Sequence, residues 1–407
     1  MAKNDNLTDF LTDVADAIRA KKGTTDKINP QDFSAEIASI ETSQEVVEAP
    51  FNNVNFRDYD GFILYSYTKD EFLALTEMPP LPTCKGLICQ EWNWTWEEAV
   101  EYVSEYGILE VGATYITDDG ATRLHMRFCK EEQLINVPLY FWQQYSEGVS
   151  IDWGDGSTPE RVSGTGNVNT SHIYAVGGDY VIKIQCDSGR MNLTHRITGY
   201  SIFGNINESN TIDIARTLRK VEFGNKVSAL GYQAFADCLN LTDIIIPKGI
   251  NTIDGFAMLS VPTRWVTIPN GVTQMPRTIG AFPVESVCLP SSFESFIKSC
   301  FYNGGIQHII IPSSTTILSA ESFYGCLSLR KLVVPKSITS IQARCFNNCR
   351  KMKLYDFTHH EQVPTLENID AFTGIPTDCE IRVPKALEAE WKQATNWSEY
   401  ANQIVGV

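Results

Sequence analysis

The chain has 407 residues, of which 43% are hydrophobic and 20% charged, so it is long and apolar enough for roughly two to four folded units. Its net charge of −16 argues against a nucleic-acid partner, because phosphate backbones are bound by clusters of Lys and Arg and the sequence has no such cluster. No stretch approaches the roughly 18 apolar residues of a membrane-spanning helix, and the first residues lack a basic region followed by an apolar run. We therefore expect neither membrane insertion nor a secretory signal.

Residues 1–42 are expected to form a helical hairpin. The first helix ends near Gly23, and the second begins at Asn29-Pro30, a capping residue followed by the proline favoured in a first helical turn. Each helix has one apolar stripe, and two helices this short cannot bury both stripes on each other. We interpret the hairpin as an anchor that docks on a partner through Leu7, Phe10, Leu11, Val14, Ile18, Phe33, Ile37 and Ile40. Residues 43–50 are expected to be a linker.

Residues 51–135 are expected to form a small α+β domain. Alternating apolar residues flank Asp60-Gly61 and Asp119-Gly120, which predicts a hairpin at each turn. Thr95 and Glu98 form a capping box for a helix that ends near Gly107. Trp92, Trp94 and Trp96 could form an aromatic ligand platform, but we favour a role in the core of a domain that has few other large residues.

Residues 136–215 are expected to form a β-sandwich, because short alternating strands are separated by glycine turns. The residues Trp153-Gly154-Asp155-Gly156, His172, Tyr174 and Gly178-Asp179-Tyr180 resemble the signature of polycystic-kidney-disease (PKD) type domains. That resemblance implies an immunoglobulin-like fold and a role as a spacer or adhesion module. Asp152 and Asp155 are interpreted as turn residues rather than calcium ligands, because two carboxylates do not complete a calcium shell.

Residues 216–384 repeat. Short β-branched runs end at Pro247, Pro269, Pro290, Pro312 and Pro335, spaced 22, 21, 22 and 23 residues apart, and "KLYDF" at 353–357 is interpreted as a strand without its proline. One strand in each unit of this length predicts a solenoid, in which neighbouring units cover each other's apolar faces. Phe235, Phe323, Phe346 and Phe372 recur in phase and are expected to fill its interior. Recurring cysteines such as Cys326 and Cys349 are expected to be small buried residues, because they lie about a full repeat apart, without the paired spacing of a zinc site. A metal site at the closest pair, Cys345 and Cys349, is not favoured either.

The repeated "AF-x-x-C-x-x-L…IP" pattern resembles the BspA-type leucine-rich repeat of bacterial surface adhesins and of proteins from phages of gut anaerobes. Residues 385–407 resemble the helical cap that closes such arrays. The unit "SVPTRWVTIP" departs from the pattern, so Arg264 and Trp265 could form a local special surface, although repeat decay is the favoured explanation. The predicted fold is thus multidomain and mainly β: a helical hairpin, a small α+β domain, a PKD/Ig-like β-sandwich, and a leucine-rich-repeat solenoid with a helical C-terminal cap.

We expect no enzyme activity and no cofactor. The six histidines show no metal-ligand spacing, and His359-His360 is expected to be an exposed loop pair. The sequence has no nucleophile elbow, no phosphate-binding loop and no paired carboxylates placed for sugar hydrolysis. The catalytic and metal assignments are therefore none.

Three functions fit these observations. The segment from Leu11 to Ile37 resembles a leader found at the start of phage tail-region proteins, and a virion protein needs no secretory signal. We therefore predict a phage tail or tail-fibre component in the virion, assembled in the host cytoplasm. Its N-terminus would bind other virion proteins, its repeats would bind a host surface glycan or protein, and a homo-oligomer is possible. The alternatives are a capsid decoration or head-fibre protein and a BspA-like bacterial surface adhesin.

Overall fold

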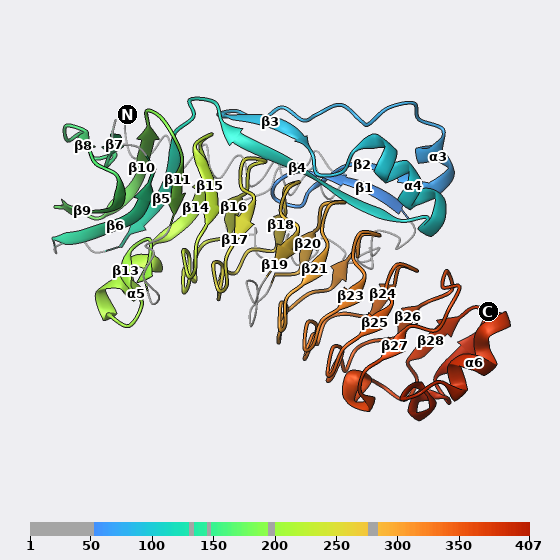
Figure 1. Ribbon diagram of the computed structural model, residues 1–407. Helices are drawn as coiled ribbons and strands as arrows, with labels where there is room; N and C mark the ends of the chain where they lie inside the picture. The colour runs from blue at the N-terminus through green and yellow to red at the C-terminus, as the bar shows by residue number, and fades with distance from the viewer. Residues whose placement is uncertain (1–52, 130–133, 145–147, 194–199, 276–283) are drawn as a thin grey trace, which may run out of the picture. The chain divides into compact units, whose positions relative to one another are not determined.

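The structure is a computed structural model that describes residues 53–129, 134–144, 148–193, 200–275 and 284–407. The chain divides into two units at Phe51, and all described residues belong to the second unit, Asn52–Val407. The predicted hairpin 1–42 and linker 43–50 lie outside the described residues. The described part is mainly β, with few and short helices (Figure 1).

The first domain is a four-stranded sheet with two helices. Its strand order is β2-β1-β4-β3, in which β1 and β4 are parallel. The elements are β1 (Asn53–Arg57), β2 (Ile63–Thr68), α3 (Lys69–Leu73), β3 (Leu87–Trp92), α4 (Trp96–Tyr106) and β4 (Leu109–Thr117). The predicted hairpin at Gly61 is confirmed, and so are the capping box of Thr95 and Glu98 and the helix stop at Gly107, which adopts φ +74°.

The predicted hairpin at Asp119-Gly120 is wrong. β4 stays in the first sheet, whereas β5 (Thr122–Phe128) pairs with strands of a different sheet. The tight turn itself exists, since the Gly120 N–H donates to Thr117 O at 3.3 Å. However, the Thr117 N–H donates to Phe223 O at 3.1 Å rather than to the strand that follows it. The sequence Asp119-Gly120 therefore specifies a tight turn, but it does not specify which sheet the next strand joins.

The next domain is a β-sandwich of two sheets. Its own strands are β6 (Ile135–Gln143), β7 (Val149–Asp152), β8 (Glu160–Val162), β9 (Gly166–Tyr174), β10 (Gly178–Cys186) and β11 (Met191–Leu193). One sheet has the order β16-β14-β5-β10-β7-β8 and the other β17-β15-β11-β6-β9. The strands β14 to β17 belong to the repeats, so both sheets of the sandwich continue directly into the solenoid. A short segment with β12 (Tyr200–Ser201), β13 (Gly204–Asn205) and α5 (Ser209–Ala215) precedes the repeats.

The repeats form a parallel solenoid whose rungs follow one another in Figure 1 from yellow to red. Its first wall consists of β14 (Leu218–Glu222), β16 (Asp243–Ile245), β18 (Trp265–Thr267), β20 (Ser286–Cys288), β22 (His308–Ile309), β24 (Lys331–Val333), β26 (Leu354–Asp356) and β28 (Glu380–Val383). A proline follows each of these strands except β14 and β26. Its second wall consists of β15 (Val227–Leu230), β17 (Thr252–Ile253), β19 (Gln274–Met275), β21 (Ser295–Phe296), β23 (Ile317–Leu318), β25 (Ser340–Ile341) and β27 (Thr365–Leu366). The predicted strand at 353–357 is confirmed as β26.

One hydrophobic core runs from Leu124 in the sandwich to Ile404 at the end of the chain. The recurring phenylalanines are fully buried, and Phe323 stacks on Phe346 at 5.3 Å between ring centroids. The recurring cysteine thiols donate to carbonyls of the preceding repeat, as Cys326 Sγ does to Phe301 O at 3.3 Å. All eleven cysteines are free. A small residue with a weak donor therefore fits the position where the chain turns into the next rung.

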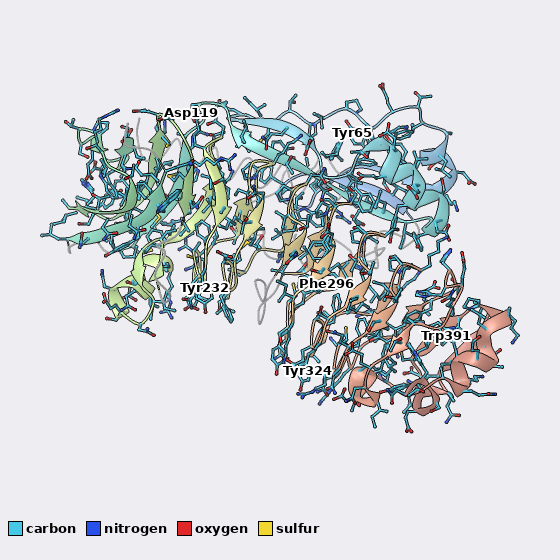
Figure 2. The ribbon with its side chains drawn as sticks, in the orientation of Figure 1. Tyr65, Asp119, Tyr232, Phe296, Tyr324 and Trp391 are labelled. Atoms are coloured by element: carbon cyan, nitrogen blue, oxygen red, sulfur yellow. The ribbon has the colours of Figure 1, made fainter. Side chains whose placement is uncertain are left out.

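The C-terminal segment closes the stack. It consists of η3 (Lys385–Leu387), α6 (Glu388–Gln393), η4 (Trp397–Tyr400) and β29 (Ile404–Gly406), and β29 pairs with β28 as a further parallel rung. Trp391, labelled in Figure 2, and Trp397 both pack on Phe357 of the last repeats, at 5.0 and 5.6 Å between ring centroids. The end of the core is thus covered by aromatic side chains. Within the described ranges, no helix has both the length and the apolar character needed to cross a membrane.

Candidate functional site

The first wall of the solenoid is buried on both faces along much of its length. In the run Ile244-Ile245-Ile246 all three side chains are no more than 3% exposed, although alternate residues of a strand point to opposite faces. Ile245 belongs to the core of the first domain, and Ile310 packs against that core. The first domain therefore lies on the outer face of the first wall. A strand that is apolar at every position is typical of a parallel sheet covered on both sides.

The recurring prolines leave one backbone carbonyl per repeat without a donor in the sheet. In a parallel ladder the N–H and C=O of one residue point to the same neighbouring strand. Ile268 donates its N–H to Cys288 O at 2.9 Å, and in the same register its carbonyl faces the nitrogen of Pro290, which has no hydrogen. The same register places the Leu289 carbonyl opposite Pro312. Since these residues are buried, each carbonyl needs a donor from elsewhere.

The first domain supplies these donors from its side chains. Asn93 Nδ2 donates to Ile268 O at 3.1 Å, and Trp94 Nε1 donates to Leu289 O at 2.9 Å. The Tyr102 hydroxyl donates to Ile311 O at 3.0 Å. Each acceptor is the residue immediately before a proline, and the three belong to consecutive repeats. Successive side chains of the first domain are therefore aligned with successive proline positions of the solenoid.

Helix α4 follows the repeats with one turn for each rung, and Figure 1 shows it beside β4 over the first wall. Glu98, Tyr102 and Tyr106 are four residues apart and contact consecutive repeats. Glu98 Oε2 accepts from Ser291 Oγ at 2.6 Å, and the Tyr106 hydroxyl accepts from Lys336 N at 3.2 Å. Four helical residues advance about 6 Å, close to the roughly 4.8 Å between parallel strands, so a slightly tilted helix keeps in step over two repeats.

The approach of β4 to the first wall requires a glycine. A Cβ added at Gly112 would lie 2.2 Å from Thr267 Oγ1 of β18, which is far inside van der Waals contact. Gly112 also donates its N–H to Asn93 Oδ1 at 2.9 Å and accepts from the Asn93 N–H at 2.9 Å. These two hydrogen bonds orient the Asn93 amide so that its Nδ2 points at Ile268 O. Gly112 thus sets both the distance and the orientation of the contact.

Trp265 belongs to this same interface, not to an exposed surface. It is 5% exposed and lies against Gly61, where a Cβ would be 2.8 Å from the Trp265 Cβ. The Arg57 guanidinium lies over its ring at 5.0 Å. Of the two candidate residues for a local special surface, Arg264 and Trp265, only Arg264 is exposed. It lines a pocket of about 170 Å³.

The far end of the interface carries the two adjacent histidines. His359 Nδ1 is 3.4 Å from Glu105 Oε1 at the end of α4, and Lys336 Nζ is 3.2 Å from the same oxygen. His360, by contrast, is 4% exposed, and its Nε2 lies 3.2 Å from Val334 O, the carbonyl before Pro335. A carbonyl only accepts, so Nε2 carries the hydrogen. The predicted exposed pair is wrong for His360, and burial lowers the pKa of His360 to about 4.

The other predicted site residues have structural surroundings or lie outside the described residues. The docking residues Leu7, Phe10, Leu11, Val14, Ile18, Phe33, Ile37 and Ile40 lie outside them. Trp92 packs on Phe56 at 5.0 Å in the core of the first domain, as we favoured. In the sandwich, Asp152 Oδ1 and Asp155 Oδ1 accept from turn amides, and Asp155 Oδ2 lies 2.7 Å from His172 Nε2. Within the described ranges, no three His, Cys, Asp or Glu side chains are grouped to hold a metal ion.

The sequence contains a signal for the covered wall that the prediction missed. The middle residue of each strand run before a proline points outward, and under the first domain this position is apolar or small: Ile245, Thr267, Cys288, Ile310 and Val333. The equivalent outward positions in the last two rungs are Asp356 and Arg382. The change from apolar to charged marks the point at which the cover ends.

Comparison with known proteins identifies the repeats. Residues 208–279 and 279–374 match the family described as BspA type leucine rich repeat region (6 copies), so the chain carries a repeat region of this type. No curated protein matches the chain.

Four chains of solved structures match it, and two of them are leucine-rich proteins. One is a leucine rich cell surface protein from Faecalibacterium prausnitzii A2-165, with 17% identity and a TM-score of 0.28, covering 47% of this chain and 64% of that one. The chain thus spans less than two thirds of that protein. The other is a leucine-rich repeat protein from Bacteroides ovatus ATCC 8483, with 15% identity and a TM-score of 0.17, covering 46% and 76%.

Proposed function

We propose that this protein is an adhesion protein that acts by binding, with the repeat region as the part that contacts a surface. The observation that carries the proposal is the BspA type repeat region, whose stacked strands share one hydrophobic core with the sandwich and pair with it through β5–β14 and β11–β15. A stack of this kind offers an extended surface for many weak contacts. Repetition on a cell or particle would add avidity.

The sandwich would act as a spacer in this proposal. The PKD-type assignment rests on the tetrapeptide at 153–156 and on His172 and Tyr174, which the fold brings together. Trp153 stacks on His172 at 5.0 Å, and the Tyr174 hydroxyl donates to Trp153 O at 2.6 Å. Because its two sheets continue into the solenoid, force applied to the sandwich would pass directly into the repeats.

The virion location is proposed as a second candidate, on the basis of the two apolar stripes of residues 1–42. Mass spectrometry of purified particles, made with and without residues 1–42, tests it. We expect the protein to be found in the particles only when residues 1–42 are present. Two results would refute the role of residues 1–42 as an anchor: particles that incorporate the shortened protein normally, and particles that contain neither form of the protein. Labelling of the head rather than the tail would instead favour capsid decoration.

The adhesion proposal is tested by immobilising the full chain and measuring the capture of intact bacterial cells from a panel of anaerobes. The full chain is needed because an isolated repeat region would expose the edges of β14 and β15 and the uncovered first wall. An unrelated immobilised protein of the same net charge is the control. If no cell in the panel is captured above this control, the adhesion proposal fails.

A further inference from the structure

The second wall of the solenoid presents a regular polar face. Its strands pair in parallel, so Ser295, Ile317 and Ser340 stand side by side on consecutive rungs. Their chain neighbours Phe296, Leu318 and Ile341 are buried in the core, which fixes the alternate residues outward. We call the second-wall face the set Ser295, Ile297, Thr316, Ile317, Thr339 and Ser340.

This face combines hydroxyl groups with a little exposed apolar surface. Thr316 and Thr339 are exposed, and Ile297 and Ile317 are 42% and 39% exposed. The first wall offers nothing similar between β16 and β24, because the first domain already occupies its outer face and its proline-flanking carbonyls. Of the two strand walls, the second is the one that the described part of the first domain leaves open.

The charge of this face excludes an anionic partner. None of the described second-wall strands, β15 to β27, contains Lys or Arg. Beside the face, Glu321 lies 3.3 Å from Arg344 and 4.0 Å from Lys298, and Arg344 lies 3.4 Å from Asp370. Glu294 precedes Ser295, and Glu367 accepts from Ser340 Oγ at 3.4 Å, so carboxylates outnumber cations around the face. These surroundings offer a polyanion no cluster of cations, whereas an uncharged polar ligand can exchange hydrogen bonds with the hydroxyl groups and carboxylates.

We propose that the second-wall face binds an extended neutral glycan whose chain lies across the rungs. The rungs repeat about every 4.8 Å, close to the advance of one sugar unit in an extended β-linked chain, so successive sugars would each meet a hydroxyl group, from Ser295, Thr316 and Ser340 in turn. Ile297 and Ile317 would contact the C–H faces of the sugar rings. This inference rests on the proposed adhesive function and names the ligand class and the wall.

The test is affinity electrophoresis of the full chain in gels that contain hydroxyethylcellulose, galactomannan, mannan or dextran as neutral probes, with alginate as the anionic one. The test variant is Thr316→Arg with Thr339→Arg, and the matched control is Leu239→Arg with Leu327→Arg, which places the same charges at exposed positions away from the second wall. Circular dichroism and melting curves verify that both variants fold.

We expect at least one neutral polysaccharide to retard the chain, with little effect of added salt. The Thr316/Thr339 variant should bind roughly tenfold more weakly or worse, and the Leu239/Leu327 variant should bind normally. Equal retardation of both variants, retardation by alginate alone, or no retardation while cells are still captured would overturn the glycan assignment and leave the adhesion proposal standing. Failure of both cell capture and polysaccharide binding would refute the adhesion proposal itself, and this inference with it.

Discussion

The Tyr102→Phe substitution tests whether the first domain is held to the repeats by the proline-flanking carbonyls. It removes only the hydroxyl that donates to Ile311 O at 3.0 Å and keeps the ring that packs on Trp94 and Tyr106. Tyr102 is 3% exposed and Ile311 is fully buried, so the Ile311 carbonyl would be left without a partner and without water. Such a loss costs about 1–3 kcal/mol, which corresponds to an opening equilibrium about fivefold to 150-fold larger.

Hydrogen–deuterium exchange of the full chain measures this equilibrium at helix α4. We expect the amides of α4 to exchange faster by the factor given above, whereas those of the sandwich strand β6 should be unchanged. Tyr67→Phe, which removes a hydroxyl from the same domain at a site that packs on Phe56 and Phe72, is the control. If α4 exchanges at the same rate in Tyr102→Phe and in the unchanged protein, the carbonyl contact does not hold the domain in place.

Three further predictions concern the same interface and the core. Gly112→Ala should lower the melting temperature because the new Cβ would clash with Thr267, and Thr267→Ala should restore part of the loss; a double variant no more stable than Gly112→Ala alone would contradict the close approach. His360 has a folded pKa near 4 and an ordinary unfolded value near 6.5, so the unfolded state binds the proton first. The contribution of neutral His360 to the free energy of unfolding is complete above pH 6.5 and falls by about 3 kcal/mol between pH 6.5 and 4. In urea unfolding, His360→Gln should therefore make the free energy of unfolding less dependent on pH over that window. An unchanged pH dependence would refute this prediction. A thiol reagent should modify the exposed Cys129 in the native protein and reach the buried Cys326, whose pKa burial raises, only after unfolding; rapid native reaction of Cys326 would show that the stack opens.

The repeats could be predicted from sequence because their signal is local and recurs. Proline at the end of each strand and phenylalanine in the interior follow directly from backbone chemistry and core packing, so their spacing fixed the rungs, including β26 without a proline. The turn at Asp60-Gly61 and the capping box at Thr95 were predictable for the same reason.

The arrangement of the domains could not be predicted in this way. Alternation in β5 shows that one face is buried, but it does not show that β10 and β14 are the partners rather than β4. Likewise, Trp94 was interpreted as a core residue, and nothing in the sequence near Asn93, Trp94 or Tyr102 indicates that their acceptors lie 175 to 209 residues further along the chain. Ile245 and Cys288 did carry a usable signal, because a strand run that is apolar at all three positions indicates a sheet covered on both faces.

Successive turns of helix α4 contact successive repeats, and this match limits how the protein can change in length. A repeat inserted between β18 and β24 would move every later acceptor by one rung, and α4 would need an additional turn with a donor at the matching position. Beyond His359, which is the last repeat residue described above as contacting α4, whole repeats could be added or removed without disturbing that register. The proline-flanking carbonyls thus divide the solenoid into a segment of fixed length and a segment free to lengthen.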